Sequence, residues 1–315
     1  MSKKIKCALM TCALAVIVAF SVAFPACSLK SNHPRAKITV SFNSVSYEIE
    51  YTLYRNMYPQ TVQHFIELAD SGFYDNMIVH NYTTSTDWFT GAYGFNSSHE
   101  EGTLTYEDAY ASGATALREY LSANSKEQAY YNLAAEGALT PTVYKKVGYD
   151  EKGKPKPEDA LPTLIGEFSA NDHKIENNAL TATTGALKMF YYEKEVPNKQ
   201  VAIVTGSNQI LEHSYQYNCA TSVFTMQVGS SSSYSAEKYC VFGDLKNDSA
   251  KETLNELLDA IADYLDNEGW TTSSFTTSVS TAVDELDTYS NPKDEVKFAI
   301  PRIPLIIESV KITKH

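Results

Sequence analysis

Positive charge is scarce in this chain, in which 26 lysines and arginines stand against 38 aspartates and glutamates, for a formal net charge of −12. Affinity for nucleic acid comes mainly from lysine and arginine on phosphates. The composition therefore argues against a nucleic-acid partner, and the simplest interpretation of the excess acid is solubility. A content of 43% hydrophobic and 20% charged residues is ordinary for a soluble globular fold.

Cysteine is also scarce, with five in 315 residues. Two of them lie in an apolar stretch at the N-terminus, and Cys27 has a separate interpretation given below. Only Cys219 and Cys240 remain, so the chain has no disulfide framework, although one bridge between them stays an open alternative. The seven histidines show no metal-ligand spacing such as HExxH, so we predict no metal site and no cofactor.

The N-terminus has the three-part plan of a secretory signal. Basic MSKKIK is followed by 20 uncharged residues and then Cys27. Phe24-Pro25-Ala26-Cys27 is similar to a bacterial lipoprotein processing site, which predicts a signal peptide over 1–26, an acylated Cys27 and a polar tether to residue 36. Loss of Lys3, Lys4 and Lys6 would take the net charge from −12 to −15. The alternative is an uncleaved transmembrane anchor. Both place the rest of the chain outside the cytoplasmic membrane.

Hydrophobic alternation predicts strands over 37–42 and 47–54, joined as a hairpin, and another over 76–82. Residues 59–73 have one apolar helical face, with Pro59 in the first turn and Gly72 at the end. A second helix is expected over 249–266, where Ser249 and Glu252 form a capping box. Further short strands are expected at 179–193, 200–206, 222–229, 238–245 and 296–313.

Two stretches do not fit this pattern. Residues 95–165 contain two predicted helices and a polar loop over 148–162, which suggests an insertion rather than part of a sheet. Residues 268–295 are rich in serine and threonine and predict a loop with a short helix. The remaining segments, many short strands with two amphipathic helices, favour a closed β-barrel capped by helices within one domain over 37–315.

Five segments, in order along the chain, resemble cyclophilin-type peptidyl-prolyl isomerases. They are YPQTVQHFIELADSGFYDNMIVH (58–80), GEFSAN with ALTATTGALKM (166–189), NCATSVFTMQVGSS (218–231), EKYCVFGDL (237–245) and IPRIPLIIESVKI (300–312). The resemblance implies a mainly β fold: a closed antiparallel eight-stranded β-barrel capped by two α-helices, with 95–165 as a helical insertion beside a groove on its outer surface. It also implies proline-containing segments as ligands.

The chemistry of such an enzyme is to bind the twisted X-Pro amide better than either planar form. In the family an arginine donates to the prolyl nitrogen, on the strand that usually reads Phe-His-Arg. Here the strand reads Val79-His80-Asn81, so Asn81 takes the place of the catalytic arginine. An amide donor is shorter and uncharged, and charge-assisted hydrogen bonds are about twice as strong as neutral ones. The substitution predicts weak turnover.

Other groove positions that the resemblance implies have changed as well. Thr90 takes the place of a glutamine, Val223 replaces a second polar contact, and Thr225 replaces an aromatic of the proline pocket. Phe190 and Tyr191 follow Met189 where a small residue and an asparagine are usual, and Tyr239 keeps an aromatic. The predicted substrate groove comprises His80, Trp88, Phe89, Thr90, Phe190, Tyr191, Val223, Phe224, Thr225 and Tyr239.

Several of these residues have a structural alternative. We favour a hydrogen-bonded structural role for His80 over a general base, and barrel core over ligand contact for Phe224 and Phe242. Trp88 and Phe89 are expected to be the exposed aromatics. Tyr106, Tyr110, Tyr130 and Tyr131 could line a groove, but packing of the insertion onto the barrel is favoured.

Three functions compete. The first is a lipid-anchored prolyl isomerase for exported proteins, located on the outer face of the bacterial cell membrane. The second is a non-catalytic cyclophilin-like lipoprotein that binds peptides or a protein partner. A lipoprotein that captures small solutes is suggested by the anchor alone, and the resemblance argues against it. Slow uncatalysed X-Pro isomerisation gives the first hypothesis its purpose.

Overall fold

The protein is described here from a computed structural model. It describes residues 30–98, 103–139, 144–149, 155–168, 173–174, 180–190, 201–204, 210–213, 219–230, 240–282 and 295–315. The predicted signal peptide and Cys27 lie outside the described residues, as do Tyr191 and Tyr239.

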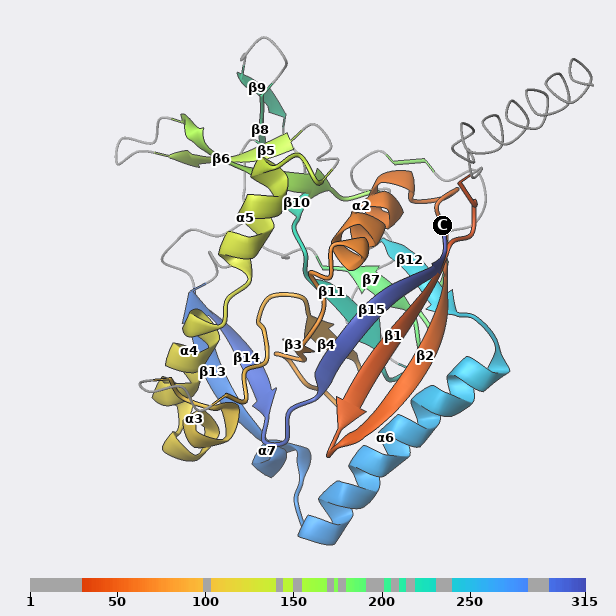
Figure 1. Ribbon diagram of the computed structural model, residues 1–315, viewed down its shortest axis with the longest axis vertical. Coiled ribbons are helices and arrows are strands. Elements are labelled where there is room, and N and C mark those ends of the chain that lie inside the picture. Colours follow the sequence, from red (N-terminus) through yellow and green to blue (C-terminus); the bar gives the residue numbers. More distant parts are fainter. Residues whose placement is uncertain are drawn as a thin grey trace, which may run out of the picture.

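An eight-stranded antiparallel sheet forms the body of the protein, in the strand order β3-β15-β1-β2-β12-β7-β11-β4 (Figure 1). The strands are β1 (Arg35–Phe42), β2 (Val45–Leu53), β3 (Met77–Ile78), β4 (Asp87–Thr90), β7 (Leu187–Met189), β11 (Phe224–Gln227), β12 (Val241–Leu245) and β15 (Ile306–Lys314). Beside the end strands, His80 donates its backbone N–H to Phe89 (2.8 Å) and Ile78 donates to Tyr93 (3.0 Å). These bonds nearly close the sheet, so the predicted eight-stranded barrel is confirmed.

The β1–β2 hairpin follows from local sequence. Phe42 pairs with Val45, which leaves Asn43 and Ser44 as a two-residue turn. Both turn residues have positive φ, 47° and 66°, the conformation that the twist of a two-residue hairpin favours. In β1 the inward side chains, such as Ile38 and Val40, are fully buried. The predicted hairpin is confirmed, with β1 starting two residues earlier than expected.

Helix α2 (Pro59–Asp70) is confirmed at the predicted place, with Pro59 in its first turn and Gly72 just past its end at a φ of +70°. Its N-terminus receives a cap from far along the chain. The carboxylate of Glu167 accepts the backbone N–H groups of Gln60 (3.2 Å) and Thr61 (2.8 Å). Those two donors have no partner within the helix, and an acidic group is favourable at this end.

Helix α6 (Asp248–Glu268) is longer than predicted and begins at a different cap. The side chain of Asn247 accepts the N–H of Ala250 at 3.0 Å, so the predicted capping box at Ser249 is wrong. Leu254, Leu257 and Ile261 bury the apolar stripe of the helix against the barrel. Helices α2 and α6 lie at opposite ends of the barrel (Figure 1).

The stretch 95–165 differs from its prediction in two ways. The described residues of its first part form three helices instead of two, α3 (Tyr106–Ser112), α4 (Ala114–Ala123) and α5 (Glu127–Ala135). Its second part contains β5 (Tyr144–Tyr149) and β6 (Pro155–Ile165), which pair with each other, and β6 also pairs with β10 (Cys219–Ala220). The polar stretch predicted as a loop is therefore mostly sheet. A further small hairpin joins β8 (Val201–Val204) to β9 (Ile210–His213).

The serine- and threonine-rich stretch contains the predicted short helix, α7 (Thr272–Phe275), but the rest is not all loop. Strand β13 (Thr276–Ala282) pairs along its whole length with β14 (Glu295–Pro301). Threonine and valine favour strands, and Val279 is buried between more exposed neighbours, as expected for a strand. The serine- and threonine-rich composition did not indicate this. Among the described residues, no helix has both the length and the apolar character needed to cross a membrane.

Two segments far apart in sequence pack together beside the barrel. The hydroxyl of Tyr106 on α3 donates to the carbonyl of Pro301 at 2.5 Å, and that of Tyr110 donates to Phe275 at 3.2 Å. Figure 1 shows α3, α4, β13 and β14 together on one side of the molecule. These bonds support the packing role predicted for the tyrosines of the insertion.

Candidate functional site

Strand register decides which side chains share the predicted groove. Thr225 on β11 pairs with Phe89 on β4 and with Lys188 on β7, and Asn81 forms a bridge with Phe89. Directly paired residues of antiparallel strands project to the same face. Asn81, Phe89, Lys188 and Thr225 therefore lie on one face of the barrel wall, which we call the groove face.

Alternation extends this face and separates other predicted residues from it. Val223 and Gln227 flank Thr225 at two-residue spacing, and Gln227 pairs with Asp87, so all three also belong to the groove face. The ring of Phe190 meets that of Phe89 edge-on, with 5.0 Å between centroids. The predicted groove thus gains Asp87, Lys188 and Gln227, none of which sequence reasoning had assigned.

Trp88, Thr90 and Phe224 point the other way, into the barrel. Phe224 packs edge-on against Phe65 of α2 at 5.3 Å, and the Thr90 hydroxyl donates to the Ile78 carbonyl at 2.9 Å. Trp88 is 1% exposed and Phe89 6%, so the expectation that they are exposed aromatics is wrong. Trp88 is buried inside the barrel, which fills with large side chains, whereas Phe89 is buried on the groove face, where Phe190 packs against it. For Phe224 the predicted core position is confirmed.

Asn81 is half-buried and is held by β14. Its side-chain oxygen accepts the backbone N–H of Ala299 at 3.0 Å, and the Ala299 carbonyl accepts the N–H of Tyr82 at 2.9 Å. An asparagine amide carries one acceptor and two N–H donors. With the oxygen engaged by β14, the N–H donors are what Asn81 can offer to a peptide.

His80 is buried on the inward side, where its ring meets Tyr93 and Phe298 edge-on at 5.2 and 5.0 Å. Its Nδ1 has no hydrogen-bond partner among the described residues, so the hydrogen-bonded part of the structural role stays a prediction. Burial lowers the pKa of His80 to about 3, which keeps the ring neutral at physiological pH. A ring packed between two aromatics, away from the groove face, acts as core.

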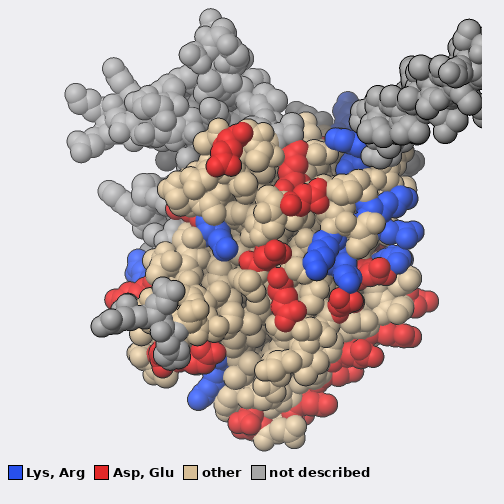
Figure 2. Space-filling model, viewed as in Figure 1, with Lys and Arg blue, Asp and Glu red and all other residues tan. Residues whose placement is uncertain are grey.

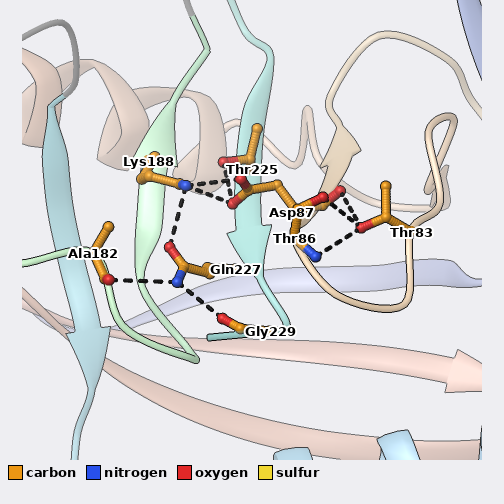
Figure 3. A network of polar contacts seen from close by, with 8 residues as sticks. All are labelled: Thr83, Thr86, Asp87, Ala182, Lys188, Thr225, Gln227 and Gly229. Carbon is orange, nitrogen blue, oxygen red and sulfur yellow. Dashed lines mark hydrogen bonds and ion pairs between the residues drawn. The ribbon is translucent and has the colours of Figure 1, made fainter. Parts of the chain in front are cut away.

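A buried ion pair occupies the middle of the groove face (Figure 3). The Lys188 ammonium lies 2.6 Å from Asp87 Oδ1 and donates to Asp87 Oδ2 at 2.8 Å and to Gln227 Oε1 at 3.2 Å. The Thr225 hydroxyl approaches Asp87 Oδ1 at 3.5 Å. Lys188 and Asp87 are 0% and 1% exposed. Burial lowers the pKa of Lys188, and the bond to Asp87 opposes this shift.

This network replaces an apolar surface with a charged one at the place where the resemblance implies a pocket for proline. A proline ring that binds against this ion pair gains little free energy, because the hydrophobic effect depends on contact between apolar surfaces. Asn81 and Phe190 are only partly buried, while Lys188, Thr225 and Gln227 are closed off. The accessible part of the groove face is therefore its Asn81 end.

Val223 and Cys240 are both buried. Val223 is 5% exposed, and its carbonyl accepts the N–H of Phe190 at 3.0 Å. Cys240 is a buried free thiol 3.5 Å from the Thr61 hydroxyl, so the alternative of a bridge to Cys219 is not realised. Within the described residues no cluster of three or more histidine, cysteine or acidic side chains could hold a metal ion.

A sequence signal existed for the missed residues. Asp87 precedes the apolar Trp88-Phe89, and Lys188 stands alone between Leu187 and Met189. A single charge inside a short apolar strand predicts a buried or functional partner, but the partner itself lies 101 residues away. Pairing of the two needs the order of strands β4, β11 and β7 in the sheet.

Comparison with models of protein families gives a match over most of the chain. The family model described as "Cyclophilin type peptidyl-prolyl cis-trans isomerase/CLD" matches residues 37–277. No curated protein matches the sequence.

Solved structures with similarity include a cyclophilin type peptidyl-prolyl cis-trans isomerase of Cryptosporidium parvum, at 14% identity and a TM-score of 0.36, covering 90% of this chain and 99% of that one. The structure of the same enzyme in the presence of the dipeptide Ala-Pro has 14% identity and a TM-score of 0.34, and the match covers 89% of this chain and 99% of that one. The Mimivirus cyclophilin has 10% identity and a TM-score of 0.35, and the match covers 91% of this chain and 92% of that one.

Proposed function

Since the chain belongs to the cyclophilin-type peptidyl-prolyl cis-trans isomerase family, as the match over residues 37–277 shows, we propose that it is a slow isomerase of proline-containing segments in exported proteins. The members of this family catalyse rotation about X-Pro peptide bonds. The observation that carries the slow rate is the state of Asn81, whose amide oxygen is bound to Ala299.

The reaction needs a donor for a nitrogen that changes character. In a planar amide the lone pair of the nitrogen is delocalised into the carbonyl, and rotation of a peptide bond costs about 18–20 kcal/mol. In the twisted amide the lone pair is localised, so a donor held near the prolyl nitrogen stabilises the transition state more than the ground state. The N–H groups of Asn81 are suitable in kind and weaker than a cation.

The site of action follows from the N-terminus. A signal over 1–26 and an acylated Cys27 would anchor the domain to the outer face of the bacterial cell membrane. Proteins that emerge there unfolded contain X-Pro bonds that isomerise over tens to hundreds of seconds without a catalyst. The substrates we propose are therefore newly exported chains.

A measured rate tests the proposal. The chain from residue 28, which retains every described residue, is assayed by line-shape or exchange NMR on a proline-containing tetrapeptide. We expect exchange well above the uncatalysed rate yet about 10- to 30-fold below that of an enzyme with the arginine, because a neutral donor supplies about half of the free energy by which a charged one contributes about 100- to 1000-fold. Exchange at the uncatalysed rate from a folded protein would reject it.

A second candidate is a non-catalytic module that binds peptides or a protein partner. The observation that favours it is the buried Lys188–Asp87 pair, which fills the centre of the groove face with satisfied charge. This candidate predicts chemical-shift changes at Phe190 and Asn81 on addition of the peptide without any gain in its exchange rate. The NMR experiment thus separates the two candidates in one sample.

A further inference from the structure

Strands β1 and β15 place like charges opposite each other on the outside of the barrel. Arg35 pairs with Lys314, and Lys37 pairs with Lys311. Like charges directly opposite across antiparallel strands destabilise the sheet. Lys37 is offset by two acids of β2: the Glu48 carboxylate lies 2.7 Å from its ammonium, and Glu50 pairs with it across the two strands. Arg35, Lys311 and Lys314 are exposed. A chain with a net charge of −12 therefore concentrates cations where they repel one another.

This basic ladder, Arg35, Lys37, Lys311 and Lys314, lies where the chain enters the domain. Ser31 donates its N–H to the carbonyl of the C-terminal residue His315 at 2.9 Å, and its own carbonyl accepts from the Arg55 guanidinium at 3.0 Å. The tether is thus fixed to the domain from Ser31, well before residue 36. Four residues from Cys27 to Ser31 reach at most about 14 Å when fully extended.

The acidic residues gather elsewhere. The exposed face of α6 carries one basic residue, Lys251, against seven acidic ones, Asp248, Glu252, Glu256, Asp259, Asp263, Asp266 and Glu268. Figure 2 shows blue side chains grouped on the upper right of the molecule, near the C-terminus marked in Figure 1, and red ones along its lower right edge, where α6 runs. The basic ladder and the acidic face of α6 are therefore separate regions of the surface.

We propose that the basic ladder binds the anionic headgroups of the membrane in which Cys27 is anchored, and so fixes the orientation of the domain. The inference rests on the lipid anchor proposed above. The short tether holds the ladder near the lipid surface, where screening acts over about 8 Å at physiological salt. Headgroup phosphates offset the repulsion between the paired cations. Anionic headgroups repel the acidic α6 outward, which turns that face toward solvent.

The test uses vesicles and the chain from residue 28, which has no acyl group, so that the ladder is measured apart from the anchor and from catalysis. Co-sedimentation at about 20 mM salt compares neutral phosphatidylcholine vesicles with vesicles that contain 40% phosphatidylglycerol as a chosen composition. A basic residue near an anionic surface contributes about 1 kcal/mol, a factor of about five. The variant R35Q/K311Q/K314Q should therefore bind anionic vesicles about 100-fold more weakly.

A matched control removes three exposed cations from other places, K174Q/K251Q/K297Q, with the same change in net charge. It should bind within about twofold of the unaltered chain. Equal loss in both triple variants, equal binding to both kinds of vesicle, or no binding to anionic vesicles would each overturn the proposal. Binding to soluble polyglutamate but not to vesicles would overturn it too, in favour of a polyanionic partner. Separation of the full-length chain into the membrane fraction tests the anchor independently.

Discussion

At the scale of single residues, Asn81 contributes both to the fold and to the proposed binding of a peptide. Its oxygen is bound to Ala299 of β14, which leaves its two N–H groups as the donors that it can offer to a peptide. A side chain that serves both the fold and a ligand is a compromise, and the two roles can be separated by substitution.

Asn81→Arg should raise kcat/KM on a proline tetrapeptide by about 10- to 30-fold, because a preorganised charged donor contributes about 100- to 1000-fold and a neutral one supplies about half of that free energy. It should also lower the free energy of unfolding by about 1 kcal/mol, since the N–H of Ala299 loses its acceptor. Asn81→Leu is the control and should abolish turnover. An arginine variant that folds and turns over like the parent would mean that the Lys188–Asp87 pair limits the rate.

The ion pair makes a prediction about stability. Lys188→Met should lower the free energy of unfolding by about 3–5 kcal/mol, because it leaves the Asp87 carboxylate buried without its partner. The double variant Asp87→Leu with Lys188→Met should regain most of that loss, since well-packed apolar side chains can replace a buried pair. Urea unfolding of the three proteins measures this. Additive losses in the double variant would contradict it.

His80 makes the stability depend on pH. Burial lowers its pKa to about 3, against about 6.5 in an unfolded chain, so between these values the unfolded state binds one more proton. Its contribution is complete above pH 6.5 and falls as the pH drops toward 3, by about 1.4 kcal/mol per unit. Urea unfolding at pH 7, 6 and 5 should show that the free energy of unfolding of His80→Leu falls less with decreasing pH than that of the parent protein. Parallel curves for the two proteins would reject the buried neutral ring.

At the scale of elements, two residues near the N-terminus of α6 could act as its N-cap. Ser249 and Glu252 fit the pattern of a capping box, but the side chain of Asn247 makes the bond. The cap therefore lies two residues before the one that the pattern suggests, because β12 ends at Leu245 and leaves Asn247 in the extended conformation that a cap needs.

Asn247→Ala should cost about 1 kcal/mol of unfolding free energy, since the N–H of Ala250 loses its acceptor. Ser249→Ala is the matched control, two residues away in the same helical turn, and should change stability by less than about 0.5 kcal/mol. Thermal or urea unfolding distinguishes them. A larger loss at Ser249 than at Asn247 would restore the capping box.

At the scale of the whole molecule, the α3–α4 pair and the β13–β14 hairpin form one unit that also holds Asn81. Tyr106 links α3 to Pro301, which ends β14, and Ala299 of the same strand binds Asn81. The hairpin therefore joins the insertion to the groove face, and loosening one should loosen the other.

Tyr106→Phe should test this coupling. It removes the donor to the buried carbonyl of Pro301, at a cost of about 1–3 kcal/mol. Hydrogen exchange should then increase together in α3, α4, β13 and β14 while β1 and β2 stay protected, because cooperative units open as wholes. Tyr110→Phe, whose bond to Phe275 is longer and only partly buried, is the milder comparison. Faster exchange confined to α3 would show that the segments are independent.

Local patterns in the sequence were enough for the elements whose pairing is local. Alternation and a two-residue turn specify the β1–β2 hairpin, and a 3.6-residue stripe with Pro59 and Gly72 specifies α2. The ordered set of motifs also predicted the barrel and the replacement of a cation by Asn81. The hairpin and the helix depend on neighbours within one or two turns of chain, so a single sequence carries the information, whereas the barrel and the role of Asn81 came from the resemblance of the ordered motifs to a family.

Closure of the barrel decided the rest. The faces of Trp88 and Phe89, the pairing of Lys188 with Asp87 and the bond from Ala299 to Asn81 all follow from which strands become neighbours. Those partners are 101 and 218 residues apart. A charge in a strand indicates that it needs a counterion but not where the counterion comes from. Strand order supplies that answer, because it brings distant residues to hydrogen-bonding distance and gives each strand an inner and an outer face.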